Sequence, residues 1–132
     1  MLLTRASEYA LLSLDTIRKA DKPVGAEHLA NELNIPKSFL AKIMQSLARE
    51  GILESKKGAH GGFLLAQELE EITLYSVITA AEGKAPAVLD CTQYVDSCPS
   101  GAIGSCSISP FLHRFQTKID DFLLNLTLKD IL

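Results

Sequence analysis

The sequence predicts a mainly α-helical (α+β) fold, a winged helix-turn-helix domain with a long C-terminal dimerisation helix. Two short helical patterns are separated only by Asn34-Ile35-Pro36, which is the spacing of a helix-turn-helix. A basic, glycine-rich hairpin pattern follows them, and a helical apolar stripe lies near the end of the chain. We therefore expect a winged domain over 1–83, a cysteine-bearing sensor loop over 84–108, and the dimerisation helix with a C-terminal tail over 109–132.

The composition is that of a globular protein. Of the 132 residues, 47% are hydrophobic and 22% are charged, and there is no low-complexity tract, which excludes a disordered or collagen-like chain. No apolar run reaches the roughly 18 residues of a transmembrane helix, and the first residues lack the apolar core of a signal peptide. We expect a cytoplasmic protein with no membrane partner.

Three helices are predicted before residue 52. Thr4 is a candidate N-cap for the first, which ends before Asp21, and the second covers 26–33. The third runs from Lys37 to Glu50 with Gly51 as its C-cap. Its spacing predicts that five side chains face inward: Phe39, Leu40, Ile43, Met44 and Leu47.

After Gly51 the period changes to that of strands. We predict a strand over 52–55, a turn over 56–62 and a returning strand over 63–65, followed by a helix that Thr73 caps and Gly83 ends. Ser109 as N-cap and Pro110 at the first helical position predict a helix of about 16 residues. Its apolar side chains form a stripe that we expect to lie between subunits, with burial inside one chain as the alternative: Phe111, Leu112, Phe115, Ile119, Phe122, Leu123 and Leu126.

The net charge of −3 is unevenly distributed. Residues 1–65 contain nine Lys or Arg against seven Asp or Glu, whereas residues 66–132 contain four against nine. A polyanion would therefore meet the N-terminal half of the chain.

The third helix and the hairpin are a candidate double-stranded DNA interface, because the second helix of such a motif enters the major groove and the hairpin reaches the adjacent backbone or minor groove. The alternative is that these polar side chains are simply solvated. A P-loop is excluded, since no Gly-Lys-Ser/Thr pattern opens a helix. The candidate contacts are Lys37, Ser38, Lys42 and Gln45 on the helix and Lys56, Lys57, His60, Gly61 and Gly62 on the hairpin.

Several segments resemble the Rrf-two family of bacterial winged-helix transcription regulators, which includes IscR-like and NsrR-like proteins. The resemblance covers essentially the whole chain and is most specific in the hairpin. It implies a dimeric regulator whose hairpin directs a basic residue at the minor groove. That residue is Lys57 here, at a position where arginine is common in the family. The segments are Thr4-Arg5, Tyr9-Ala10, the residues 35–40, the hairpin 57–63, Glu71-Ile72-Thr73 and the C-terminal 125–132.

Three cysteines, Cys91, Cys98 and Cys106, fall within sixteen residues. An odd number in a reducing compartment argues against structural disulfides. Thiolates suit zinc, copper(I) or an iron–sulfur cluster, and three of them leave one ligand to come from elsewhere. The alternative is a set of reactive thiols that bind no metal.

The family resemblance favours an iron–sulfur cluster in this loop. IscR-like members use a histidine three residues after the last cysteine, where this sequence has Ser109, and neither His28 nor His113 matches that position. NsrR-like members use an acidic residue from the first helix of the partner subunit, and the matching residue is Glu8. The resemblance thus implies Glu8 of the partner subunit as the fourth ligand.

These observations predict a homodimeric transcription regulator, a repressor, whose DNA binding responds to redox state, nitric oxide or iron–sulfur status. The alternative is a winged-helix regulator without a cluster, which responds through thiol oxidation, a small molecule or a partner protein. An enzyme with a small-molecule substrate is the weakest hypothesis, because the cysteine loop contains no histidine to act as a base.

Overall fold

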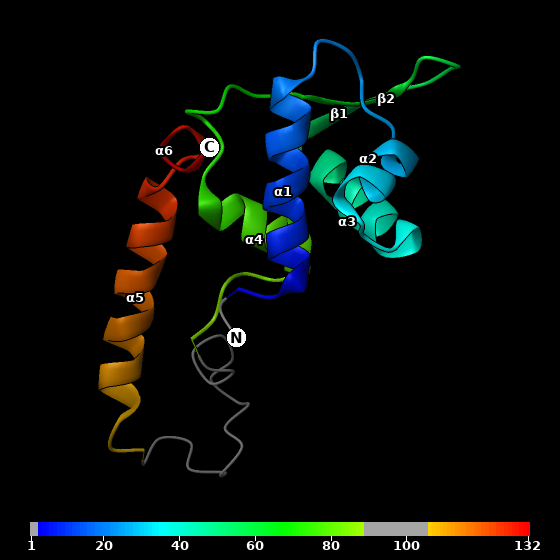
Figure 1. Cartoon of the computed structure of the whole chain (residues 1–132). Helices are drawn as coiled ribbons and strands as arrows, with labels where there is room; N and C mark the ends of the chain where they lie inside the picture. Colours follow the sequence, from blue (N-terminus) through cyan, green and yellow to red (C-terminus); the bar gives the residue numbers. More distant parts are fainter. Residues whose placement is uncertain (1–2, 89–105) are drawn as a thin grey trace.

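The structure is a computed structural model that describes residues 3–88 and 106–132. Figure 1 shows α1 and α4 in the middle, with α2, α3 and the hairpin on one side and α5 on the other. No helix of the described ranges is long and apolar enough to cross a membrane. The elements in chain order are α1 (Arg5–Lys19), α2 (Ala26–Leu33), α3 (Lys37–Arg49), β1 (Leu53–Lys56), β2 (Gly62–Leu65), α4 (Leu74–Glu82), α5 (Ser109–Asn125) and α6 (Leu128–Ile131).

The helix-turn-helix is confirmed and is closed at both helix ends by left-handed residues. Asn34, with φ 56°, ends α2, and the Ile35 N–H donates to the Ala30 carbonyl. At the end of α3, Gly51 has φ 79° and follows the C-cap Glu50. Reversals of this kind satisfy the last carbonyls of a helix and turn the chain sharply.

The prediction that Phe39 faces inward is wrong. The other four predicted inward residues of α3 are buried, whereas Phe39 is 42% exposed. Its ring packs edge-to-face on Tyr9 of α1, with centroids 5.7 Å apart. Phe39 lies at the edge of the apolar stripe, so it reaches the neighbouring helix instead of the centre of the core.

The hairpin is a two-stranded antiparallel sheet whose register pairs Leu53 with Leu65 and Lys56 with Gly62. The first predicted strand is displaced by one residue, since Ile52 precedes β1 and Lys56 belongs to it, whereas the second begins one residue earlier than predicted, at Gly62. Val24, just before α2, pairs with Phe63 of β2 through two backbone hydrogen bonds of 3.0 and 2.8 Å. This pair fastens the hairpin to the start of the helix-turn-helix.

The long C-terminal helix begins one residue earlier than predicted. Ile108 is its N-cap, with no side-chain cap hydrogen bond, so Ser109 and Pro110 are its first two residues. Leu123 of α5 forms a small core with Leu74 and Ile78 of α4. On its outer side, Phe111 and Phe122 are 55% and 62% exposed. Within one chain, therefore, only one side of the apolar stripe is covered.

The C-terminal segment was expected only as a tail, but it forms α6 and returns to the middle of the chain. Thr127 pairs with Thr73 in an antiparallel bridge. The Leu128 N–H donates to the Ile72 carbonyl at 2.9 Å, and the Leu128 side chain is fully buried in the main core. The last turn of the chain thereby anchors the C-terminal end of α5 to the winged domain.

Candidate functional site

The outer face of α3 presents the four polar residues that the sequence predicted there. Lys37, Ser38, Lys42 and Gln45 are all exposed. The Lys37 ammonium lies 3.2 Å from the Glu27 carboxylate of α2. Lys42 has no acidic partner within the described ranges. Of these two lysines, Lys42 is therefore unpaired, and Lys37 is in an exposed ion pair, which is a weak interaction that a phosphate can replace.

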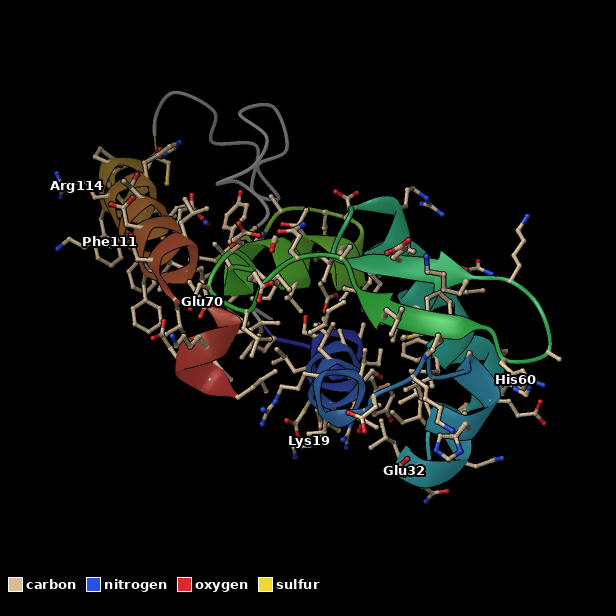
Figure 2. The ribbon with its side chains drawn as sticks, turned by 90° about the horizontal axis from the view of Figure 1, so that it is seen from above. Lys19, Glu32, His60, Glu70, Phe111 and Arg114 are labelled. Carbon is tan, nitrogen blue, oxygen red and sulfur yellow. The ribbon has the colours of Figure 1, made fainter. Side chains whose placement is uncertain are left out.

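The hairpin tip is also basic and exposed. Lys56 forms an ion pair with Glu54 at 2.7 Å, while Lys57 has no acidic partner in the part of the chain that is described. Figure 2 shows His60 on the side of the hairpin and α2, away from Phe111 and Arg114 on α5. The basic tip and the aromatic face of α5 thus lie on opposite sides of the molecule.

Gly61 and Gly62 are required by the hairpin itself. A Cβ at Gly61 would lie 2.3 Å from the Lys56 carbonyl oxygen. Gly62 has φ +147°, and a Cβ there would lie 2.5 Å from the Val24 carbonyl carbon. Both positions therefore require glycine for conformational reasons, because a side chain would prevent the hairpin from closing on itself and from packing against the start of α2.

The Val24–Phe63 pair makes the two basic surfaces parts of one unit. It holds β2 against the residue that leads into α2, and β1 packs on α3. A helix and a hairpin tied in this way keep a fixed spacing, which is what simultaneous contact with neighbouring parts of a duplex requires.

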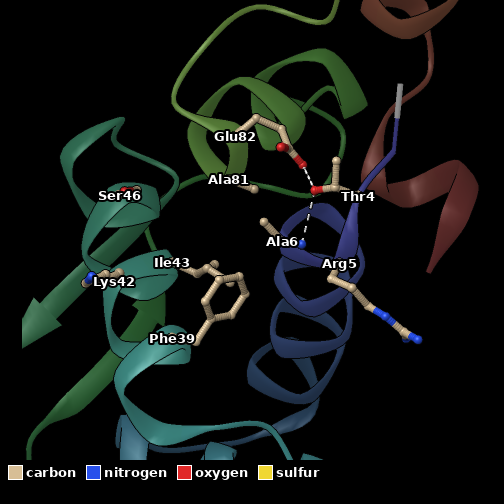
Figure 3. A pocket seen from close by; sticks show the side chains of 9 residues that line it. All are labelled: Thr4, Arg5, Ala6, Phe39, Lys42, Ile43, Ser46, Ala81 and Glu82. Carbon is tan, nitrogen blue, oxygen red and sulfur yellow. Dashed lines mark hydrogen bonds between the residues drawn. The ribbon is translucent and has the colours of Figure 1, made fainter. Parts of the chain in front are cut away.

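A groove of about 640 Å³ lies between α1, α3 and the end of α4 (Figure 3). Its floor is mostly apolar, and Phe39 points across it from α3 toward α1. At one end, the Glu82 carboxylate accepts hydrogen bonds from the hydroxyls of Thr4 and Ser7. Sequence patterns gave no signal for this contact, because its residues are more than seventy positions apart.

The structure shows only part of the predicted cysteine site. Cys91 and Cys98 lie outside the described residues, and Cys106 is a half-buried free thiol just before α5. The Glu8 side chain is 52% exposed and pairs with Arg5 at 3.1 Å. No group of three metal-ligating side chains occurs among the residues that the structure describes.

His113 is engaged inside α5. Its Nδ1 lies 2.8 Å from the Ser109 carbonyl oxygen and 3.3 Å from the Ser109 hydroxyl. The carbonyl can only accept, so Nδ1 donates and carries the proton. The ring is thus oriented by the first turn of the helix in which it lies.

Comparison with known proteins identifies the family. The model of the Rrf2 family, described as an iron-dependent transcriptional regulator, matches residues 3–132. The chain belongs to the Rrf2 family. A helix-turn-helix transcriptional regulator of Aquifex aeolicus is 32% identical over 133 residues, which is 100% of this chain and 92% of that protein. This Rrf2 protein is accordingly a transcription regulator, in a family that is not enzymatic.

Two further similarities extend over most of this Rrf2 chain. The regulator NsrR of Halalkalibacterium halodurans is 29% identical over 134 residues, covering 100% of this chain and 90% of that protein. A solved transcriptional regulator from Listeria innocua superposes with a TM-score of 0.76 at 25% identity, over 97% of this chain and 83% of that one. The winged helix-turn-helix fold predicted from the sequence is therefore confirmed.

Proposed function

We propose that this Rrf2 regulator binds double-stranded operator DNA as a homodimer, with α3 in the major groove and the β1–β2 hairpin at the adjacent backbone or minor groove. The observation that supports this most strongly is the Val24–Phe63 pair, which joins two exposed basic surfaces into one unit. Where the structure describes the acidic half of the chain, its helices are α4, α5 and α6, which are separate elements from α3 and the hairpin.

Each candidate residue has a distinct role in this proposal. Lys42 and Lys57, the unpaired cations, contact phosphates, and Lys57 approaches the minor groove. Ser38 and Gln45 face base edges or phosphates. Lys37 and Lys56 exchange their exposed carboxylate partners for phosphates. Gly61 and Gly62 let the backbone come close to the duplex, and His60 lies beside them at the tip of the hairpin.

The dimer forms through the outer face of α5. Phe111, Phe115 and Phe122 lie on this face and are 55%, 39% and 62% exposed. The rings of Phe111 and Phe115 are stacked, with centroids 5.8 Å apart. A contiguous aromatic surface of this kind is typical of an interface, and it continues the side of α5 that the small core with α4 leaves uncovered.

The cysteines and a carboxylate form the sensor in this proposal. The donors are Cys91, Cys98 and Cys106, with Glu8 of the partner subunit as the fourth. Three thiolates and one carboxylate fit an iron–sulfur cluster in chemistry, and Glu8 is exposed with only a surface ion pair to give up. Such a cluster supplies iron–sulfur bonds that react to redox state, nitric oxide or iron supply. Cys106, three residues before α5, links the donor set to the dimerisation helix.

A salt series tests the DNA interface. Fluorescence anisotropy with promoter DNA should give an affinity that falls steeply with salt, because phosphate contacts release counterions. Lys42→Ala and Lys57→Ala should each reduce the salt slope by about one. Lys129→Ala, which removes the same charge on α6, is the matched control and should leave the slope unchanged. Binding without salt dependence would exclude the proposed interface.

Anaerobic purification with an iron assay and a visible spectrum tests the sensor. We expect a coloured, iron-containing protein, with iron lost in Cys106→Ala and reduced in Glu8→Ala. Glu32→Ala removes another exposed helical glutamate that has one basic partner, His28, and should retain iron. A colourless, iron-free protein after reconstitution would exclude the cluster and favour a regulator that responds through its thiols, a small molecule or a partner protein.

A further inference from the structure

One polar side chain interrupts the buried face of α5. Gln116 is only 8% exposed and lies between Leu112 and Leu123, which are buried at the same face. An apolar residue would fill this position without the cost of burying an amide. The amide must therefore be compensated by hydrogen bonds.

Those hydrogen bonds go to the chain that follows α4. The Val88 N–H donates to Oε1 of Gln116 at 2.8 Å. Nε2 of Gln116 donates to the Pro86 carbonyl at 3.0 Å and to Oδ1 of Asp120 at 2.7 Å. The Asp120 contact comes from the next turn of α5 and fixes which way the amide faces.

The two backbone bonds have the pattern of a β-bridge. A strand residue that bridges a neighbour bonds through the carbonyl before it and the N–H after it. Here the groups are those of Pro86 and Val88, which flank Ala87, and the side-chain amide of Gln116 takes the place of the neighbouring peptide. One helical side chain thus sets the position of this segment along α5.

This contact holds one end of the cysteine segment, and the first turn of α5 holds the other. Val88 precedes Cys91 by three residues. At the far end, the Ser109 N–H donates to the Cys106 carbonyl at 3.3 Å. Both ends of the stretch that contains the cysteines are therefore fastened to the same helix, about two turns apart along it.

We propose that Gln116 is a positioning residue that couples the cysteine segment to α5. It acts by transmitting displacement of the chain at 86–88 to the helix. This inference rests on the proposed function, since it assigns the route by which the state of the cysteines reaches the DNA-binding domain. When a change at the cysteines displaces Val88, the displacement reaches α5 through the Gln116 amide. Without the hydrogen bonds of this amide, a displacement of Val88 no longer moves the helix.

The experiment compares the wild type with Gln116→Met, which keeps the length of the side chain and removes both backbone bonds. Gln67→Met is the matched control, because Gln67 donates a single bond to the Gly51 carbonyl at 2.8 Å, far from this segment. Three quantities are measured on the full-length protein: thermal stability, the exchange rate of the Val88 amide proton, and operator affinity before and after alkylation of the thiols with N-ethylmaleimide.

We expect Gln116→Met to remain folded at the temperature of the assays and to exchange the Val88 proton about tenfold faster or more. Alkylation should change wild-type operator affinity about tenfold, within the range of ordinary allosteric coupling. In Gln116→Met the change in affinity on alkylation should be smaller than in the wild type by at least about threefold, because only the direct route from Cys106 into α5 remains. Gln67→Met should behave as the wild type does.

Unchanged Val88 exchange in Gln116→Met would overturn the inference, and so would faster exchange with an undiminished response to alkylation, because Gln116 would then be only structural. A wild type that binds DNA but does not respond to alkylation would overturn it as well. A wild type that does not bind DNA in a salt-dependent way overturns the proposed function instead, so the two failures are distinguishable.

Discussion

The Thr4 hydroxyl and the Glu82 carboxylate are hydrogen-bonded to each other, which joins the N-cap of α1 to the last residue of α4 (Figure 3). The same Thr4 oxygen accepts the Ala6 N–H at 3.2 Å, so it caps α1 and contacts α4 at once. The same Glu82 oxygen also accepts the hydroxyl of Ser7, at 2.8 Å, and Ser7 is fully buried. One carboxylate therefore fixes how the first helix meets the helix that leads to the cysteine segment.

Removal of this carboxylate should destabilise the fold. In Glu82→Ala the buried Ser7 hydroxyl loses its acceptor, which costs about 1–3 kcal/mol of unfolding free energy. Urea unfolding at pH 7 measures the loss. Glu68→Ala, which removes an exposed carboxylate, is the control and should change stability by less than about 0.5 kcal/mol. Equal effects of the two substitutions would contradict the role given to Glu82.

The hairpin should not tolerate a side chain at residue 62. In Gly62→Ala the new Cβ meets the Val24 carbonyl carbon at 2.5 Å, so the hairpin must separate from the start of α2. We expect a loss of more than about 1 kcal/mol of stability together with weaker operator binding. Gly58→Ala is the control, because Gly58 also has a positive φ, +106°, but nothing within 4 Å of its Cβ position. Similar operator affinities in the two variants would show that the contact with Val24 is not needed.

The last helix, α6, should contribute to the core although it has only four residues. Leu128 is fully buried, so Leu128→Ala should lower the unfolding free energy by about 2–5 kcal/mol. Ile131→Ala changes an exposed apolar residue of the same helix and is the control. Denaturant unfolding followed by circular dichroism measures both. A small effect of Leu128→Ala would mean that α6 detaches readily from the domain.

The pH dependence of stability should include a contribution from Asp15. Hydrogen bonds from Lys19 and then Arg18, at 2.9 and 2.8 Å, keep the pKa of the Asp15 carboxyl below its ordinary value despite some desolvation. A lowered folded-state pKa stabilises the fold above the unfolded-state pKa of about 3.9 and loses this effect as pH falls through the folded-state pKa.

Asp15→Asn should therefore destabilise the protein at pH 7, by less than about 1 kcal/mol because the pair is near the surface. The difference from the wild type should vanish at a pH below the folded-state pKa. Urea unfolding at several pH values measures it, with Asp21→Asn as the control. A difference that stays constant down to acid pH would exclude this linkage.

The exposed aromatic residues of α5 should control self-association. Phe111→Glu with Phe122→Glu places two charges on the face that we propose as the dimer interface, and should convert the dimer to a monomer in sedimentation equilibrium. Leu12→Glu, at another exposed apolar residue, on α1, should leave the dimer intact. A double variant that remains dimeric would place the interface elsewhere.

Local patterns in the sequence predicted most of the fold, because helix caps and apolar spacing are local signals. Thr4, Thr73 and Gly83 act at the predicted helix ends. The prediction for Phe39 is wrong because residue spacing indicates which face of α3 is apolar, but not which neighbouring helix covers the edge of that face. Residue type predicts that Ser109 is an N-cap, whereas the helix already begins at Ser109, with Ile108 as its N-cap.

The contacts that were missed join residues far apart in the chain. The bridge between Thr73 and Thr127 needs α5 to run back along α4 before its partners meet. The contacts of Glu82 and Gln116 likewise depend on tertiary placement, and a glutamine in an apolar stripe is no local signal for the backbone that it binds. The nine candidate DNA contacts came from motif and charge, and they remain predictions.

The bridge between Thr73 and Thr127 also makes α5 a lever. Its C-terminal end is fixed to the winged domain, and its 17 residues give an arm of about 25 Å. A tilt of about 5° at the fixed end would carry the turn beside Cys106 through about 2 Å over such a length. Conversely, the loss of a metal–ligand bond can displace that turn by a distance of this order. Such a displacement becomes a rotation of a few degrees at the other end of α5, where the helix meets the winged domain.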